Sequence, residues 1–428
     1  MRRITLRSLL MLLVIGAFGL LTACSGSGGS TPAGVPVPPP AGQNVQPIAV
    51  NGGPLGNYTN GAFVSVNVCV PGTSTCQTID DVLVDTGSFG LRILASQLTI
   101  ALTPLTDSSG DQLNDCVQFL DNSFLWGTVD AADVKMAGEV ASNTSIQVIA
   151  NPTAYSIPTS CTTTSTGTGT NEDTQALLGA NGIFGVGPEP FDCGSACDPV
   201  TVATSGQPPL PYFACSTAIG CNPVPVSCGT LCGDTAIANQ QVTNPVFNFS
   251  GDNNGVIIEL PAVADAAATV NGSMIFGIGT QSNNALGTAT VFTFEPQTDN
   301  FTTTYKGQAY SNSFIDSGSN GLFFPDATIP VCPTTPVDLS SFYCPPSNLS
   351  GLTAINTGAN NATNTVTFGV DNTQTLLNND PADFAFSNLA GPLTDSFDWG
   401  LPFFYGRNVY TAIDGTSVGS IAGPFWAY

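Results

Sequence analysis

Short runs in which apolar and polar residues alternate follow one another from Tyr58 to the end of the chain. The segment 63–68, which reads FVSVNV, is one example, and Gly, Pro, Asn and Asp separate such runs. Alternation with a period of two is typical of strands that bury one face. Helical periodicity is nearly absent, and we expect only a short helix from Val263 to Ala268. The pattern therefore predicts an all-β protein.

One short phrase occurs twice in the chain. Residues 84–91 read VDTGSFGL and residues 315–322 read IDSGSNGL, and each copy ends an apolar run in an aspartate on a glycine-permitted turn. A repeat separated by half the chain predicts two related lobes. If a twofold axis relates the lobes, Asp85 and Asp316 meet and share a proton, since two carboxylates in contact do not both ionise easily. The alternative is that each aspartate only caps its own turn.

Composition narrows the class of protein. A length of 428 residues favours about two domains, and 42% hydrophobic residues with 25 Phe indicate a globular chain. The net charge is −23, and there are only 7 Lys and Arg residues in total. So few cations exclude a phosphate-binding track, so we expect no nucleic acid partner.

The first residues resemble a bacterial lipoprotein signal. A basic start precedes an apolar stretch at 9–21, and Leu21-Thr22-Ala23 leads to Cys24. The resemblance implies a signal peptide at 1–23, lipidation of Cys24 and a Gly/Ser/Pro linker over 24–45. Ser25 after the cysteine implies an envelope protein, anchored at the outer membrane. The alternatives are a simple secretory signal or an N-terminal membrane helix.

The cysteines fit an oxidising compartment. Removing Cys24 from the 13 cysteines leaves an even number, which favours disulfides. We expect local pairs between Cys69 and Cys76 and between Cys332 and Cys344. The pairing of six further cysteines stays open: Cys193, Cys197, Cys215, Cys221, Cys228 and Cys232. A zinc site is the alternative there, but the spacing is not Cys-x2-Cys and the chain has no His, so we expect no metal.

The segments around the repeated phrase resemble those of the pepsin-like aspartic peptidases, in the same order. Residues 181–187, NGIFGVG, resemble the apolar-Gly turn that crosses behind the first catalytic loop, and Trp399-Gly400 resembles the second crossing. The resemblance implies an all-β fold of two pseudo-twofold-related β-barrel-like lobes with a cleft between them. The N-terminal lobe would span 46–245, with a Cys/Pro-rich insertion at 188–235, and the C-terminal lobe 246–428. The chain also resembles exported bacterial lipoprotein families of unknown function, which carry the same double motif.

The resemblance also implies a set of site residues. Asp85 and Asp316 would be the catalytic pair, here called the dyad. Hydroxyl groups would lock the two loops together and orient the carboxylates, and glycines would allow close approach. The residues in these supporting roles are Thr86, Gly87, Ser88, Ser317, Gly318 and Ser319.

Two departures from the family concern the flap, the hairpin that covers the site. The family has a flap Tyr bonded to a Trp seven residues beyond the first Asp. Here Arg92 occupies the Trp position, and the flap candidate 117–124 holds no Tyr. Phe119, Leu120 and Phe124 are the flap candidates that would replace it. Arg92 could pair with Asp121 or another acid, but we expect it to face solvent.

Three functions follow from these observations. The first is an envelope-anchored aspartic endopeptidase with no cofactor, which binds a peptide or protein substrate in the interlobe cleft and contacts the membrane through its lipid. The second is a catalytically weak or inactive protein that binds a peptide or glycan in the cleft. The third is a structural lipoprotein whose repeat is only architectural. In each case we expect a monomer.

Overall fold

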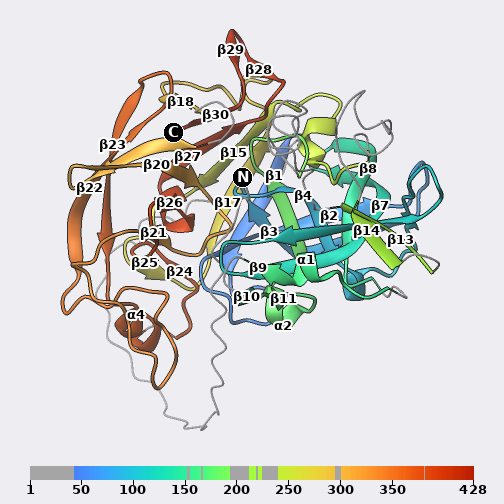
Figure 1. Ribbon diagram of the computed structural model, residues 1–428. Coiled ribbons are helices and arrows are strands. Elements are labelled where there is room, and N and C mark those ends of the chain that lie inside the picture. Colours follow the sequence, from blue (N-terminus) through green and yellow to red (C-terminus); the bar gives the residue numbers. More distant parts are fainter. Residues whose placement is uncertain are drawn as a thin grey trace, which may run out of the picture.

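The computed structural model describes residues 43–151, 155–164, 167–192, 212–217, 220–223, 240–294, 300–379 and 381–428. Strands dominate these residues, and the predicted all-β class is confirmed. Figure 1 shows two lobes, one formed by the segments coloured blue to green and one by those coloured orange to red. In the part of the chain that is described, no helix is long and apolar enough to cross a membrane. The segment predicted to be a signal peptide, Cys24 and most of the predicted linker lie outside the described residues.

The N-terminal lobe is built around two long hairpins, β2–β3 and β6–β7, and the antiparallel partner β8 of β7. Strand β2 pairs with β7, so the hairpins form one continuous sheet. The elements of this lobe are β2 (Gly61–Cys69), β3 (Cys76–Asp85), β4 (Phe89–Leu94), η1 (Ala95–Gln97), β5 (Thr103–Pro104), β6 (Gln112–Gln118), β7 (Ser123–Met136), β8 (Glu139–Ile149), α1 (Thr159–Thr162), β9 (Thr163–Thr164), β10 (Gly167–Thr168), β11 (Thr170–Asn171), α2 (Gln175–Leu178), β12 (Gly182–Val186), β13 (Tyr212–Ser216) and β14 (Gly220–Pro223).

The C-terminal lobe contains a seven-stranded sheet in the order β23-β22-β19-β20-β26-β21-β25. Its elements, with the short pieces around them, are β16 (Ala266–Ala267), β19 (Phe301–Tyr305), β20 (Gln308–Ile315), β21 (Leu322–Phe324), β22 (Leu349–Thr357), β23 (Thr363–Val370), α4 (Thr373–Asn379), β24 (Ala385–Phe386), β25 (Ala390–Pro392), β26 (Asp398–Trp399), η6 (Leu401–Phe404), β28 (Ser417–Val418) and β29 (Ile421–Ala422).

A set of antiparallel strands joins the lobes, and we call it the joining sheet. Along it, β18 pairs with β30, β30 with β27, β27 with β15, β15 with β17, and β17 with β1, which also pairs with β2. Its members are β1 (Val45–Asn51), β15 (Gly255–Leu260), β17 (Val270–Phe276), β18 (Val291–Thr293), β27 (Arg407–Ala412) and β30 (Phe425–Ala427), with η5 (Pro245–Asn248) leading into it. The lobes are therefore connected by backbone hydrogen bonds as well as by side chains.

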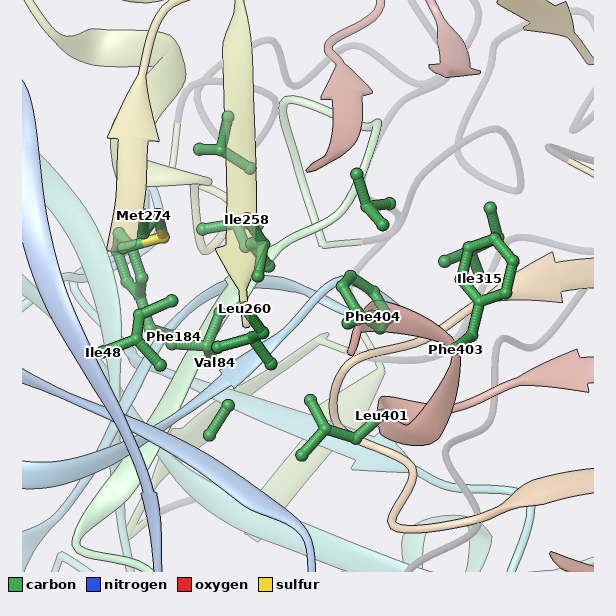
Figure 2. Packing of buried hydrophobic residues seen from close by; sticks show 14 of the residues in the cluster. Ile48, Val84, Phe184, Ile258, Leu260, Met274, Ile315, Leu401, Phe403 and Phe404 are labelled. Carbon is green, nitrogen blue, oxygen red and sulfur yellow. The ribbon is translucent and has the colours of Figure 1, made fainter. Parts of the chain in front are cut away.

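The largest hydrophobic cluster extends through both lobes and the joining sheet. Figure 2 shows Val84 near Phe184, and Ile315 near Phe403. Val84 and Ile315 immediately precede the two aspartates of the repeated phrase, and neither has exposed surface. Burial of these residues fixes the strand ends from which the aspartates project.

Four disulfides join described cysteines. The predicted pairs Cys69–Cys76 and Cys332–Cys344 are both confirmed. The two others are Cys116–Cys161, which the sequence analysis did not pair, and Cys215–Cys221 in the Cys-rich segment. Cys193, Cys197, Cys228 and Cys232 lie outside the described residues.

The expected helix from Val263 to Ala268 is wrong. Ala266–Ala267 form strand β16, which pairs with β24, and Phe384 N donates to Ala267 O. A helix of six residues is marginal in water, so pairing with a neighbouring segment outweighs the helical preference of the alanines.

Candidate active site

The two aspartates of the repeated phrase stand at equivalent strand ends. Strand β3 ends at Asp85 and β4 starts again at Phe89, whereas β20 ends at Ile315 and β21 starts at Leu322. In each lobe a third strand pairs with both the strand before the aspartate and the strand after it. Strand β12 is parallel to β3 and antiparallel to β4, and β26 is parallel to β20 and antiparallel to β21.

The registers of these strands match residue by residue. Phe184 pairs with Val84, just before Asp85, and with Leu91, six residues after it. Trp399 pairs with Ile315, just before Asp316, and with Leu322, six residues after it. The crossing strands predicted at 181–187 and 399–400 therefore occupy equivalent places behind the two aspartates.

Thr86 and Ser317 link the two loops by a reciprocal set of hydrogen bonds. Thr86 Oγ1 donates to Ile315 O at 3.1 Å and accepts from Ser317 N at 2.9 Å. Ser317 Oγ donates to Val84 O at 2.8 Å and accepts from Thr86 N at 3.1 Å. Each hydroxyl uses its single hydrogen and one lone pair, so the arrangement is satisfied on both sides. The four bonds hold the strand ends of the two lobes together.

Each aspartate of the dyad accepts the same pair of hydrogen bonds. Asp85 Oδ1 accepts from Gly87 N at 2.9 Å and its Oδ2 from Ser88 Oγ at 2.6 Å. Asp316 Oδ1 accepts from Gly318 N at 2.8 Å and its Oδ2 from Ser319 Oγ at 2.8 Å. Two donors on each carboxylate fix its plane and its orientation.

The dyad carboxyls meet across the lobes, and each loop glycine lies against the opposite aspartate. A Cβ on Gly87 would lie 2.5 Å from Asp316 Cγ, and a Cβ on Gly318 would lie 2.6 Å from Asp85 Oδ1 and 3.1 Å from Asp316 Oδ1. Any side chain at these two positions would displace the dyad. The Asp85 and Asp316 carboxyls are within hydrogen-bonding reach, with both Oδ1 atoms near Gly318.

Burial and charge favour a shared proton. Burial, then Asp85 and then Asp398 raise the pKa of Asp316 well above its usual range. Neither Asp85 nor Asp316 has exposed surface, whereas Gly87 and Ser88 are partly exposed. Of the two loops, the first is therefore the more exposed at its glycine and the following serine.

Asp398, on β26, is a third carboxyl near the dyad that the sequence analysis missed. It has no exposed surface, and burial raises its pKa well above the usual range, with a further contribution from Asp85. The repeat itself carried a signal for this residue. When Gly185 is aligned with Gly400, the sequence Ile183-Phe184-Gly185 corresponds to Asp398-Trp399-Gly400. Asp398 therefore stands at the position that Ile183 has in the first lobe.

The expectation that Arg92 faces solvent is wrong. Arg92 is 1% exposed and forms ion pairs with Asp115 and, at 2.9 Å, with Asp192. Gln147 Oε1 accepts a third bond at 2.7 Å, and Tyr212 donates to Asp192 at 2.6 Å. Every residue of β4 is buried, so an arginine on this strand cannot reach solvent. The buried acids Asp115 and Asp192 are its partners, in agreement with the alternative that Arg92 pairs with an acid other than Asp121.

The buried Arg92 cluster carries an excess of acid. Burial and Asp192 raise the pKa of Asp115 to about 8, although Arg92 opposes this. Burial also raises the pKa of Asp192. The pKa of Arg92 is raised, because Asp115 and Asp192 outweigh the effect of its burial. The cluster lies directly behind the first loop, since Arg92 also contacts Phe89 O at 3.4 Å.

The flap candidates lie at the turn between β6 and β7. Phe119 and Phe124 are buried in two different clusters of the N-terminal lobe, and Leu120 is half-buried. The Cys116–Cys161 disulfide and the bonds from Gln118 Nε2 to Cys161 O and Thr163 O hold this turn to the following segment. The structure thus brings together Asp85, Asp316 and their six supporting residues, and it places Phe119 and Leu120 in the turn and Phe124 at the start of β7.

No cluster of three or more His, Cys, Asp or Glu side chains that could hold a metal ion occurs within the described ranges. The fold and the site together define an all-β, two-lobed protein with paired aspartate loops. The chain belongs to the family described as a protein of unknown function (DUF3443), whose model matches residues 40–428.

No curated protein matches the chain. Among solved structures, the chain is similar to the aspartic proteinase from Irpex lacteus, with 13% sequence identity, 90% of this chain and 96% of that chain covered, and a TM-score of 0.44. A similarity of this size does not bear on function.

Proposed function

We propose that this protein is an aspartic-type endopeptidase that hydrolyses peptide bonds with a water activated between Asp85 and Asp316. The observation that carries the proposal is the meeting of two identically bonded carboxyls, each against the glycine of the opposite loop. A fold that needed only two turns would gain nothing from placing two buried carboxyls in contact, because burial and mutual repulsion oppose their ionisation.

The dyad performs the reaction with one shared proton. The ionised carboxylate accepts a proton from the water, whose oxygen forms a bond to the peptide carbon. The protonated carboxyl donates its proton to the carbonyl oxygen as the C=O double bond opens, which gives a tetrahedral diol. The proton taken from the water then passes to the amide nitrogen as the C–N bond breaks. One diol hydroxyl returns its proton to the other carboxyl as the C=O bond re-forms, which restores the shared proton. Burial raises the pKa of Asp316, which favours one proton being kept between the two carboxyls before water attacks.

The supporting residues act by orientation. Ser88 and Ser319 hold the Oδ2 atoms, which leaves the Oδ1 atoms near Gly318 for the shared proton and the water. Thr86 and Ser317 fix the spacing of the loops. A rigid site of this kind loses little energy to reorganisation during the reaction.

The substrate we propose is a peptide or unfolded protein segment lying between the lobes. The enzyme would be a monomer. A lipid on Cys24 would anchor it at the bacterial outer membrane, and the tract over 24–45 would serve as a tether. These assignments rest on the sequence, in which Cys24 follows a basic and apolar leader.

The test uses the full chain purified in detergent and an unfolded protein substrate between pH 3 and pH 8. We expect hydrolysis in the acid range, inhibition by pepstatin, and a rate loss of about 10²–10⁴-fold in Asp85→Asn and Asp316→Asn. Asp371→Asn, which removes a buried acid that accepts a hydrogen bond from Asn388 outside the site, is the matched control. Retention of the wild-type rate by Asp316→Asn would contradict the proposal.

A second candidate is a protein that binds a peptide or glycan without cleaving it. The turn between β6 and β7 favours this candidate, because it offers no Tyr and is held by the Cys116–Cys161 disulfide. In this case calorimetry would detect binding of a peptide or glycan by the wild type, with equal affinity in Asp316→Asn and no turnover in either.

A further inference from the structure

Asp398 is a buried carboxyl without an ordinary hydrogen-bond partner. Neither of its side-chain oxygens is bonded to any described residue, and the side chain has no exposed surface. Its backbone is fixed, since Phe314 and Ile315 pair with Asp398 and Trp399, and Asp316 N donates to Trp399 O at 3.1 Å. The carboxyl is thus held in place by its strand while its own polar atoms are unpaired.

The fold does not require an acid at this place. The first lobe has Ile183 at the equivalent position, where it pairs with Leu83 on β3 and Arg92 on β4, as Asp398 pairs with Phe314 on β20 and Phe323 on β21. An isoleucine therefore suits the same crossing of strands. The carboxyl of Asp398 needs an explanation other than packing.

The charged groups that act on Asp398 are the dyad acids. Asp85 raises the pKa of Asp398, and Asp398 in turn raises that of Asp316. Its register partners on β20 and β21, Phe314 and Phe323, do not titrate. Among the described ion pairs none includes Asp398. A buried acid beside two other acids and no cation is neutral.

Ser319 connects Asp398 to the dyad. The Ser319 hydroxyl lies close to Asp398, whose pKa it lowers against the larger effect of burial, and it donates its single hydrogen to Asp316 Oδ2 at 2.8 Å. A hydroxyl that has already donated its hydrogen can only accept from a second group. A neutral Asp398 carries the hydrogen that this acceptor needs.

We propose that Asp398 is a positioning residue of the dyad, which as a neutral acid donates to Ser319 Oγ and thereby keeps the Ser319 hydrogen on Asp316 Oδ2. Ionised Asp398 would instead attract that hydrogen, so that the Ser319 hydroxyl turns away and Asp316 loses a donor. The dyad is then complete only while Asp398 holds its proton. This inference rests on the proposed function for its effect on rate, but not for its effect on stability.

The first experiment does not need activity. Thermal unfolding of the full chain is measured from pH 4 to pH 9 for the wild type, Asp398→Asn, Asp398→Ile, Ser319→Ala and the double variant Asp398→Asn/Ser319→Ala. A folded-state pKa above the unfolded value costs stability as pH rises, so the advantage of Asp398→Asn over the wild type grows with pH. The double variant departs from additivity, since the two residues are coupled. A pH-independent difference, or additivity at every pH, overturns the proposal.

The second experiment uses the rate. Asp398→Asn keeps a donor for Ser319 at every pH, so we expect an acid-side kcat near that of the wild type and an alkaline limb moved up by about one pH unit or more. Asp398→Ile, which restores the residue of the first lobe, lowers kcat several-fold with KM unchanged. Identical pH profiles for Asp398→Asn and the wild type overturn the proposal. Absence of hydrolysis in the wild type rejects the proposed function, and the thermal cycle then decides on Asp398 alone.

Discussion

Strand β4 behind Asp85 carries Arg92 at the position where strand β21 behind Asp316 carries Phe323. On the crossing strands the difference is reversed, with Ile183 in the first lobe and Asp398 in the second. The hydrogen bonds on the two dyad acids are nevertheless the same. The comparison teaches that the loop geometry is set by the backbone and hydroxyl bonds, while the charges behind it vary independently.

We expect the largest difference in stability between the two lobes when the buried cation Arg92 is removed. Arg92→Met leaves Asp115 and Asp192 buried without their partner, and we expect it to lower the free energy of unfolding by about 3–5 kcal/mol. Urea denaturation at pH 7 measures the change. The matched variant Phe323→Leu alters the equivalent apolar position and is expected to cost less than about 1.5 kcal/mol. Equal losses of unfolding free energy in the two variants would show that the ion pairs of Arg92 contribute nothing beyond packing.

The hydroxyl bonds between the loops give the next largest effect, and here the two loops should behave alike. Thr86→Val and Ser317→Ala each leave a buried N–H and a buried carbonyl unpaired, which costs about 2–4 kcal/mol. Thr86→Ser copies the second loop and keeps the hydroxyl, so it serves as the control. Unfolding free energies that differ widely between Thr86→Val and Ser317→Ala would contradict the reciprocal arrangement.

The pH dependence of stability sharpens the contrast between acids near the two loops. The pKa values of Asp316 and Asp398 are raised well above normal, and that of Asp115 to about 8, relative to about 3.9 in an unfolded chain. Their contribution to stability is complete below about pH 4 and is lost as pH rises toward the folded values. We therefore expect Tm to fall from pH 4 to pH 8. The chain has no His to mask this change, and a Tm that rises over the range would refute it.

We expect the smallest loss of stability from the ion pair between Lys306 and Asp326, in which the lysine is exposed, unlike Arg92 in its pairs. Lys306 bonds Asp326 at 2.8 Å, but the lysine side chain is 53% exposed. Because water screens such a pair, Lys306→Met should cost only about 0.2–1 kcal/mol in urea denaturation. Asp326 keeps its bonds from Tyr305 and Thr328, so no buried charge is orphaned. A loss as large as that of Arg92→Met would mean that exposure does not separate the two pairs.

The features that the sequence predicted are those encoded within a few residues. The aspartate, glycine and hydroxyl of each loop lie in one phrase, and the pairs Cys69–Cys76 and Cys332–Cys344 close short loops. The partners of Arg92 could not be predicted in this way, because Asp192 is 100 residues away and comes from a different segment. Asp398 was missed for another reason, since an acid in a short apolar strand gives no periodic signal and only the register with Ile183 reveals it.

The place of β30 in the joining sheet has a consequence for how the molecule is made. This strand is the last of the described strands, yet it lies between β18 and β27 instead of at an edge. Strand β1, the first of the described strands, pairs with β17, more than two hundred residues later. Because a chain is synthesised from its N-terminus, this sheet cannot close until residues 425–427 have left the ribosome. Loss of residues 425–428 would therefore open a gap inside the sheet and leave β18 without its partner.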